Sequence, residues 1–185
     1  MKNRKPRYRK SRAVRCNGSE LIEFTLAFLP MLAMVLFLLN VSWAIFVKSS
    51  LEYAVRAGLR YGITVTGTQA TAAGSNLTAM VKGRVQANSL GLLSGATGLS
   101  RIFVHYFQPP SPGSNAAATD VSSESYGNSP GNIMQVSIQN FTLVPLAPRI
   151  FAWNQPADNS ATPVGAMAAD IIEPSADVPP IGVAP

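Results

Sequence analysis

The residue types that most often carry catalysis or bind metals are scarce in this chain. His105 is the single histidine and Cys16 the single cysteine among 185 residues. A Ser-His-acid arrangement needs the histidine in a pocket with a serine and a carboxylate, and nothing in the spacing around His105 indicates one. The glycines are scattered and form no phosphate-binding loop. We therefore expect no catalytic residue, no cofactor and no metal site, and we predict that the protein is not an enzyme.

The chemically informative residues lie near the N-terminus, where two acids come just before or at the start of a long apolar run. Between Leu21 and Val47 the single ionisable residue is Glu23, and from Phe24 onward that run carries no charge. A carboxylate at the edge of a membrane helix is costly unless it is paired. Alternatively, Glu20 and Glu23 mark a helix start, where acids interact favourably with the helix dipole. The two roles are compatible.

The stretch from Phe24 to Val47 is long enough to cross a membrane. Its 24 residues, at about 1.5 Å each, would form a helix of about 36 Å, against a hydrocarbon core of about 30 Å. A buried helix of a soluble domain is the alternative, but it would carry a polar face, and only Thr25, Asn40 and Ser42 interrupt this run. We therefore predict a transmembrane helix, which Pro30 is expected to kink.

The charge distribution predicts how this helix is oriented. Eight of the fifteen Lys and Arg precede Gly18, whereas from Ser19 onward seven bases face nine acids, a balance of −2. A basic segment directly before a span is retained in the cytoplasm, so the N-terminus should be cytoplasmic and the C-terminal body exported. Nucleic-acid binding by the basic arm is a weaker alternative, because no recognition helix accompanies it. Cys16 falls on the cytoplasmic side, so the exported part has no disulfide and no metal site that joins Cys16 to His105.

The long apolar helix is preceded by Gly18, then by four further residues, and then by the pair Glu23-Phe24. This pattern resembles the prepilin-peptidase site of type IV pilins and, with an aromatic residue after the Glu, that of the tight-adherence (Tad, or Flp) pilus subfamily. Residues 19–62 are similar to a TadE-like pseudopilin, and residues 133–172 resemble the family less specifically. Phe24 stands where the pilus subunit itself usually has Tyr, and the leader is long and basic. These departures leave open both cleavage and the status of minor rather than major subunit.

The resemblance implies roles for the residues of this pattern. A prepilin peptidase would cut between Gly18 and Ser19, so that Glu23 becomes the fifth residue of the mature chain and, with Phe24, belongs to the recognition segment. The new α-amino group of Ser19, in the same or a neighbouring subunit, would compensate Glu23 and register subunits during assembly. The implied partners are the membrane, the peptidase, other pilins or pseudopilins and Tad assembly proteins, in homo- or hetero-oligomers. The implied location is the bacterial inner membrane, with the domain periplasmic or extracellular and a role in adhesion or secretion.

Beyond the span the helix is predicted to continue to Gly62. Glu52 and Arg56 are correctly ordered for a surface pair worth about 0.3 kcal/mol. The apolar stripe of this helix can dock on its own C-terminal domain or on adjacent subunits, and Gly58 and Gly62 would allow close approach to either. The apolar or small residues that recur at helical spacing are Leu51, Ala54, Val55, Gly58, Leu59 and Gly62, opposite Lys48, Glu52, Arg56 and Arg60.

The rest of the chain alternates turn-rich segments with short apolar elements. His105 falls in a predicted strand, as a packed or wet-face residue. Residues 63–76 are predicted as a loop and 108–132 as an exposed loop, because both are rich in small and polar residues. The predicted elements are a helix from Asn76-Leu77 to about Leu90, a strand over 99–107, a strand from Ile133 ended by Pro145 and Pro148, a last strand over 164–172, and a disordered Pro-rich tail.

These expectations define an α+β fold class: a long transmembrane and amphipathic helix, then a small domain with a second helix and a short antiparallel sheet. The predicted organisation is a basic leader (1–18), the helix (19–62), an exported domain (63–172) with a flexible loop at 108–132, and the tail (173–185). Two functions follow. The first is a cleaved, membrane-anchored assembly component of a Tad-type pilus, related to type IV pili and type II secretion. The second is an uncut, signal-anchored exported domain that binds a surface ligand or another membrane protein.

Overall fold

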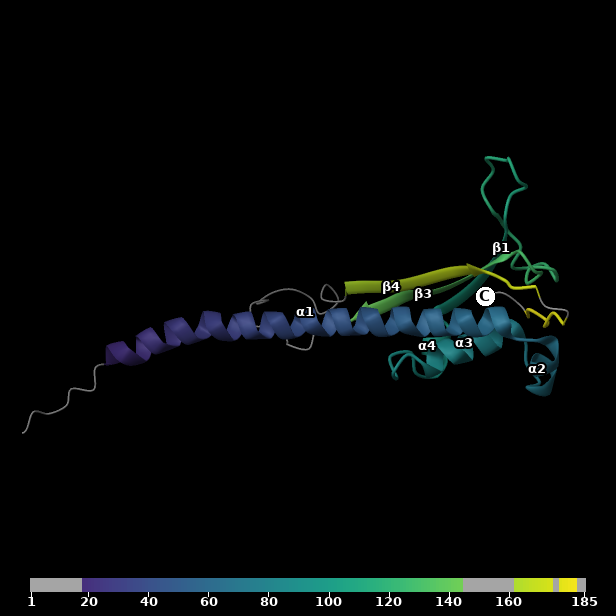
Figure 1. The fold of residues 1–185 in the computed structure, drawn as a ribbon. Helices are drawn as coiled ribbons and strands as arrows, with labels where there is room; N and C mark the ends of the chain where they lie inside the picture. Colours follow the sequence, from purple (N-terminus) through teal and green to yellow (C-terminus); the bar gives the residue numbers. More distant parts are fainter. Residues whose placement is uncertain (1–17, 145–161, 175–176, 183–185) are drawn as a thin grey trace, which may run out of the picture. The chain divides into compact units, whose positions relative to one another are not determined.

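The computed structural model describes residues 18–144, 162–174 and 177–182 (Figure 1). The predicted basic leader up to residue 17, and the two prolines predicted to end a strand, Pro145 and Pro148, lie outside these residues. The chain divides into two compact units, one up to Leu38 and the other from Leu39 onward. A single helix, α1 (Gly18–Thr64), contributes to both units.

The part of α1 that belongs to the first unit exposes its apolar side chains. Leu26 is 76% exposed and Leu21 70%, and the helix continues through Pro30. The apolar part of the helix has a mean hydropathy of 2.3 with none of it buried, so by length and composition α1 can cross a membrane. Exposed apolar side chains that are costly in water are stable in lipid. Lipid offers no hydrogen-bond partners, and in a helix the backbone amides and carbonyls pair with one another.

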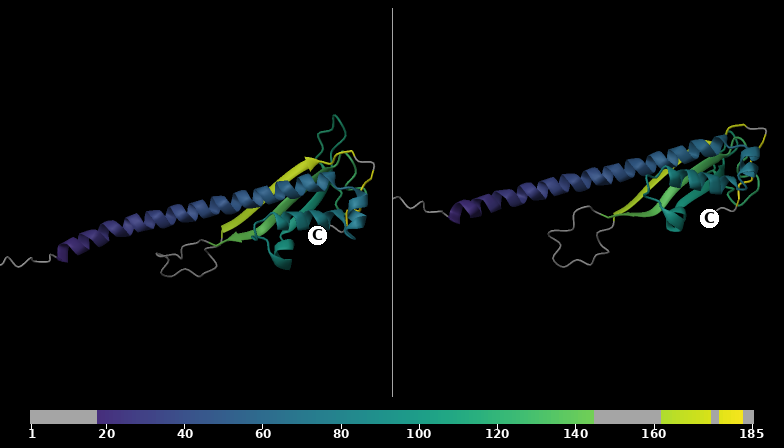
Figure 2. Two further views of the ribbon diagram at one scale, coloured as in Figure 1. Left: turned by 60° about the horizontal axis from the view of Figure 1, so that its bottom comes forward. Right: turned by 90° about the horizontal axis from the view of Figure 1, so that it is seen from below.

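The second unit is an α+β domain in which helices cover one face of an antiparallel sheet. Residues 39–64 of α1 lie beside α3 (Leu77–Ala87) on that face (Figure 2). The strand order is β2-β1-β3-β4, with every neighbouring pair antiparallel. The predicted α+β fold is confirmed. The remaining elements are α2 (Gly67–Ala72), α4 (Gly95–Leu99), β1 (Ile102–Gln108), β2 (Thr119–Asp120), β3 (Ile133–Leu143) and β4 (Thr162–Ile171).

The core forms where the apolar stripe of α1 meets α3 and the sheet. The stripe predicted from helical spacing is buried as a whole, and the predicted charged stripe opposite it points away from the core. Glu52 and Arg56 form the expected pair, with 3.9 Å between their charged atoms. Gly62 lies against Val81 of α3 and Met134 of β3. Of the two docking partners considered, the apolar stripe therefore uses its own domain.

The end of the predicted span overlaps the start of this domain. Val47 is fully buried in the core and Trp43 packs against it. The 20 residues from Phe24 to Trp43 already suffice to cross a bilayer, which needs about 20 apolar residues. One side of the last turn of the predicted span, with Trp43 and Val47, therefore packs on protein.

The second helix is shorter than predicted. Asn76 caps it as expected, because its Oδ1 accepts from the amide of Ala79 at 2.9 Å. The helix ends at Ala87, and Asn88 is its C-cap. Leu90, predicted to lie on the apolar side, is 68% exposed and has φ 52°. The backbone of Leu90 is in the left-handed conformation, so α3 cannot continue to this residue.

The predicted loop over residues 63–76 is wrong in part, because α1 extends to Thr64 and α2 follows almost at once. A capping box starts α2: the Gln69 amide donates to Thr66 Oγ1 at 3.3 Å, and the Thr66 amide donates to Gln69 Oε1 at 3.2 Å. This reciprocal pair satisfies two amides that a helix start leaves without partners. The spacing of Thr66 and Gln69 is a sequence signal for this helix start, within a stretch that is otherwise rich in Gly and Thr.

The predicted disorder of the tail is wrong for the residues that the structure describes. The amides of Leu77 and Thr78 donate to the carbonyls of Pro180 and Ile181 at 2.8 and 3.2 Å, and Ile181 is only 6% exposed. The Asp177 carboxylate accepts from the Thr68 amide at 2.7 Å. Backbone amides at the starts of α2 and α3 thus donate to acceptors in the tail. These hydrogen bonds offset the conformational entropy that is lost when the tail is ordered.

The predicted exposed loop over residues 108–132 is exposed only in its first half. Residues 108–120 are exposed, and residues 119–120 pair with the end of β1. The second half returns to the domain: Val121 and Asn128 are 3% and 2% exposed. The turn is held by Asn132, whose side-chain amide donates to the carbonyl of Gly127 at 2.9 Å.

Candidate functional site

The residues with the predicted processing and assembly roles all lie at the beginning of α1. Gly18 is the first helical residue and Ser19 the second. The first four amides of a helix have no partner within it, and glycine is among the poorest helix formers. Opening the backbone at the Gly18–Ser19 bond therefore costs less than opening it in the middle of α1. A peptidase requires such a locally opened backbone.

Glu23 and Phe24 follow one turn later, where the apolar part of the helix begins. Phe24 is 64% exposed and its ring stacks on Phe28 at 5.5 Å between centroids. Thr25 turns its hydroxyl back to the carbonyls of Leu21 and Ile22, at 3.0 and 2.9 Å. The hydroxyl is thereby satisfied within the helix, as a polar group in lipid requires. The segment presents a carboxylate followed by apolar side chains, a surface suited to a membrane edge.

His105 lies half-buried on β1, on the sheet face turned away from the helices. Its Nδ1 is 3.4 Å from Asp120 Oδ2 and has no hydrogen-bond partner within the described part of the chain. Ser122 Oγ donates to Asp120 Oδ1 at 2.5 Å. This bond, then the Ser122 amide and the nearby His105, lower the pKa of Asp120. The carboxylate lies between serine and histidine, so Ser122 is not positioned for activation by His105.

Tyr106 links the sheet to the start of α3 and to the tail. Its hydroxyl lies 3.4 Å from Thr78 Oγ1, which donates to the carbonyl of Ile181 at 2.5 Å. Burial raises the pKa of Tyr106 to about 12, against a smaller lowering by Thr78. A neutral phenol is thus fixed in the core. The contact is structural, because no reactive group faces it among these partners.

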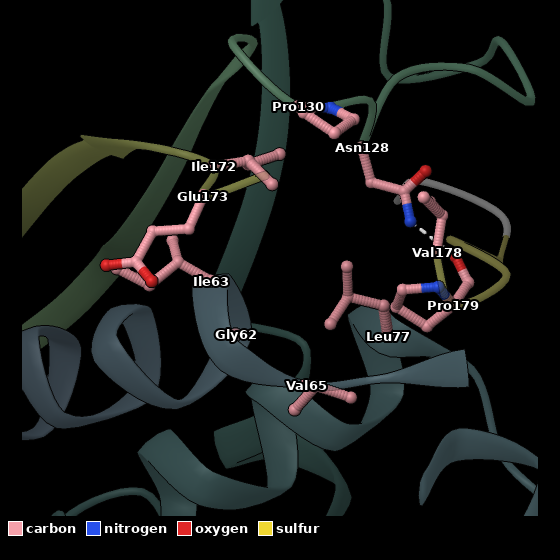
Figure 3. A pocket seen from close by; sticks show the side chains of 10 residues that line it. All are labelled: Gly62, Ile63, Val65, Leu77, Asn128, Pro130, Ile172, Glu173, Val178 and Pro179. Carbon is pink, nitrogen blue, oxygen red and sulfur yellow. Dashed lines mark hydrogen bonds between the residues drawn. The ribbon is translucent and has the colours of Figure 1, made fainter. Parts of the chain in front are cut away.

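A small pocket lies between the end of α1, the start of α3 and the tail (Figure 3). Its space is about 10 Å³, the scale of one water molecule. Leu77, Val65 and Pro179 give it apolar walls, and Asn128 donates to the carbonyl of Pro179. Asn128 Oδ1 is buried without a hydrogen-bond partner in the described ranges. The pocket suits a bound water rather than an organic ligand.

Comparison with known proteins points to the N-terminal segment. A family model described as TadE-like protein matches residues 18–60. Residues 18–60 are TadE-like. The match confirms the resemblance carried by Gly18 and Glu23-Phe24, and it associates the chain with the Tad pilus. No curated protein and no solved structure matches the chain.

The TadE-like match and the apolar helix support membrane association. One helix of sufficient length and hydropathy lies near the N-terminus of the described residues, which is compatible with a single-pass inner-membrane protein. The TadE-like segment ends just before Gly62, where α1 is already packed on the domain. The similarity thus covers the apolar helix and most of the part of α1 that packs in the core, whereas α3 and the sheet lie outside it.

The sequence reasoning missed one surface, the sheet face opposite the helices. Met167 and Ile171 of β4 are 68% and 59% exposed there. A signal for it was present in β1, Ile102 to Phe107, where apolar residues occupy both alternating sets except at His105. A strand that is apolar on both sides is typical of a sheet covered on both faces.

Proposed function

We propose that this protein is a minor, pseudopilin-like structural component of a Tad-type pilus assembly system, and that it has no catalytic role. The observation that carries the proposal is the TadE-like match over residues 18–60. The long apolar helix serves as the membrane anchor, with the N-terminus cytoplasmic and the α+β domain on the other side of the membrane.

Processing by a prepilin peptidase is the first part of the proposal. The cut falls between Gly18 and Ser19, in the first turn of α1, which opens more easily than the middle of the helix. It removes the eight Lys and Arg that precede Gly18. The mature chain then begins with an ammonium group at Ser19, and Glu23 is its fifth residue.

Registration of subunits is the second part. A carboxylate at the membrane edge is costly unless it is compensated. The ammonium group of Ser19, from the same or a neighbouring subunit, supplies that compensation for Glu23. Pairing between neighbours would fix their relative height, since each chain carries one acceptor and one donor at its helix start.

The N-terminal residue and mass of the protein purified from its native membrane test the proposal. A chain that begins at Ser19 is the expected result. A chain that begins at Met1, in cells with an active prepilin peptidase, would contradict it. An uncut, signal-anchored binding domain would then be the better proposal, a function favoured by the apolar residues on the sheet face that no described element covers.

A further inference from the structure

One face of the sheet carries large apolar side chains that no described element covers. Helices α1 and α3 pack on the other face (Figures 1 and 2). On the uncovered face Met167 and Ile171 are exposed, and Phe103, Phe107 and Ile133 are half-buried. The outer face of an antiparallel sheet is normally polar. Large apolar side chains exposed on this face indicate an interaction surface.

The strand register orders this face into three rows that cross β1, β3 and β4. The first and third rows are mainly apolar, and the row between them is mainly polar. None of the nine positions is Lys, Arg, Asp or Glu, and Asp120 lies beside the face next to His105. The rows are Phe103, Ser137 and Met167; then His105, Gln135 and Ala169; then Phe107, Ile133 and Ile171.

We propose that this face packs against the same face of a second copy of this chain, with the two copies side by side in one membrane. Residues 39–64 of α1 run along the strands rather than across them (Figure 2). Copies related by a two-fold axis stand at the same height along that axis, so with the axis along the strands each row meets its own image. Apolar rows then cover apolar rows, and the polar rows meet between them.

The chemistry of the rows fits this self-pairing. With a two-fold axis over β3, Phe103 of one copy faces Met167 of the other, and sulfur–aromatic contacts are favourable. Phe107 faces Ile171 in the same way, and Gln135 faces Gln135, which can exchange amide hydrogen bonds. Because none of the nine positions is Lys, Arg, Asp or Glu, and His105 faces Ala169 of the other copy, the image brings no like charges together.

The size of the face predicts where the pair is stable. The face has nine positions, whereas a stable interface between soluble proteins has roughly 20 to 30 residues on each side. Anchoring in a membrane raises the local concentration of the partner and compensates for a weak contact. The pair therefore forms in the bilayer and dissociates in dilute detergent solution. It depends on anchoring but not on the cut after Gly18.

Cysteine cross-linking of the full chain in phosphatidylcholine vesicles tests this inference, with Cys16→Ser in every variant. Gln135→Cys lies at the proposed two-fold axis, and Ala79→Cys, on the exposed side of α3, is the control for chance collisions. We expect a covalent dimer of Gln135→Cys to form at least about tenfold faster than that of Ala79→Cys. A mixture of His105→Cys and Ala169→Cys copies should cross-link faster than either variant alone.

Second substitutions show whether the apolar rows hold the pair. Met167→Glu should slow the Gln135→Cys cross-link about tenfold, because it places a charge against Phe103 of the other copy, whereas Met167→Leu should leave the rate unchanged. Equal rates for Gln135→Cys and Ala79→Cys would overturn the proposal, as would insensitivity to Met167→Glu. A Gln135→Cys product seen only in native membranes, at the mass of a different protein, would assign the face to another partner.

Discussion

Gly58 of α1 lies directly against Val85 of α3. A Cβ built at position 58 would come within 2.3 Å of Val85 Cγ2. The two helices can approach this closely only because residue 58 has no side chain. The glycine therefore sets the distance between α1 and α3, and with it the packing of the core on the sheet.

Substitution of Gly58 by valine should destabilise the domain by about 1 to 3 kcal/mol, because overpacking forces neighbouring side chains and helices to shift. Denaturant unfolding of the full chain in micelles measures this change. Gly83→Ala is the matched control, since a Cβ at position 83 meets nothing within 4 Å, and it should stabilise α3 by about 0.5 to 1 kcal/mol. An unchanged midpoint for Gly58→Val would contradict the close packing described above.

Gly18→Ala should block the proposed processing, because the proposed cut requires a residue without a side chain before it. The measurement is the mass of the protein from native membranes, where the variant should keep its basic leader. Gly83→Ala, a glycine substitution far from the cut, should be processed normally. A Gly18→Ala variant with the mass of the cleaved protein would contradict a prepilin-type cut at this position.

Glu23→Ala should leave cleavage and membrane insertion intact but reduce assembly at least about tenfold, because the ammonium group of Ser19 loses its counter-charge at the membrane edge. Pilus yield from cells that carry only the variant measures this effect. Glu20→Ala is the matched control, an acid in the first turn of α1 with no proposed pairing role. Normal pilus yield with Glu23→Ala would remove the registration role.

The stability of the domain should fall at high pH because of Tyr106. Burial raises its pKa from 10.0 to about 12, so folding favours the neutral phenol. Its contribution, about 3 kcal/mol by the size of the shift, is fully present below pH 10 and is lost as the pH rises from 10 to 12. Tyr106→Phe should show a smaller loss over this range in denaturant unfolding. Parallel pH profiles for the two proteins would show that Tyr106 does not titrate with folding.

Ile181→Ala should destabilise the domain by about 2 to 4 kcal/mol, the cost of deleting a buried aliphatic side chain. Ile181 is 6% exposed, whereas its neighbour in the tail, Val178, is 44% exposed, and Val178→Ala should cost less than about 0.5 kcal/mol. Thermal unfolding of both variants measures the difference. If both variants melt together with the parent protein, the tail does not belong to the folded core.

Local sequence determined those features that depend on residues close together in the chain. The absence of charge from Phe24 onward predicts the apolar helix, and the spacing of Leu51, Ala54 and Val55 predicts the face that is buried. Asn76 before Leu77 predicts the start of α3. The Gly18 to Phe24 pattern predicts the TadE-like segment that the family model matches.

Tertiary structure decided the features that depend on residues far apart in the chain. The stripe of α1 could have packed on another subunit, and only the positions of Val81, Val85 and Met134 assign it to its own domain. The tail is Pro-rich, and its order comes from helix-start amides about a hundred residues earlier that need acceptors. Likewise, Phe103 and Met167 become one surface only through the β1–β3–β4 register. Such pairings arise between distant segments, and local composition does not encode them.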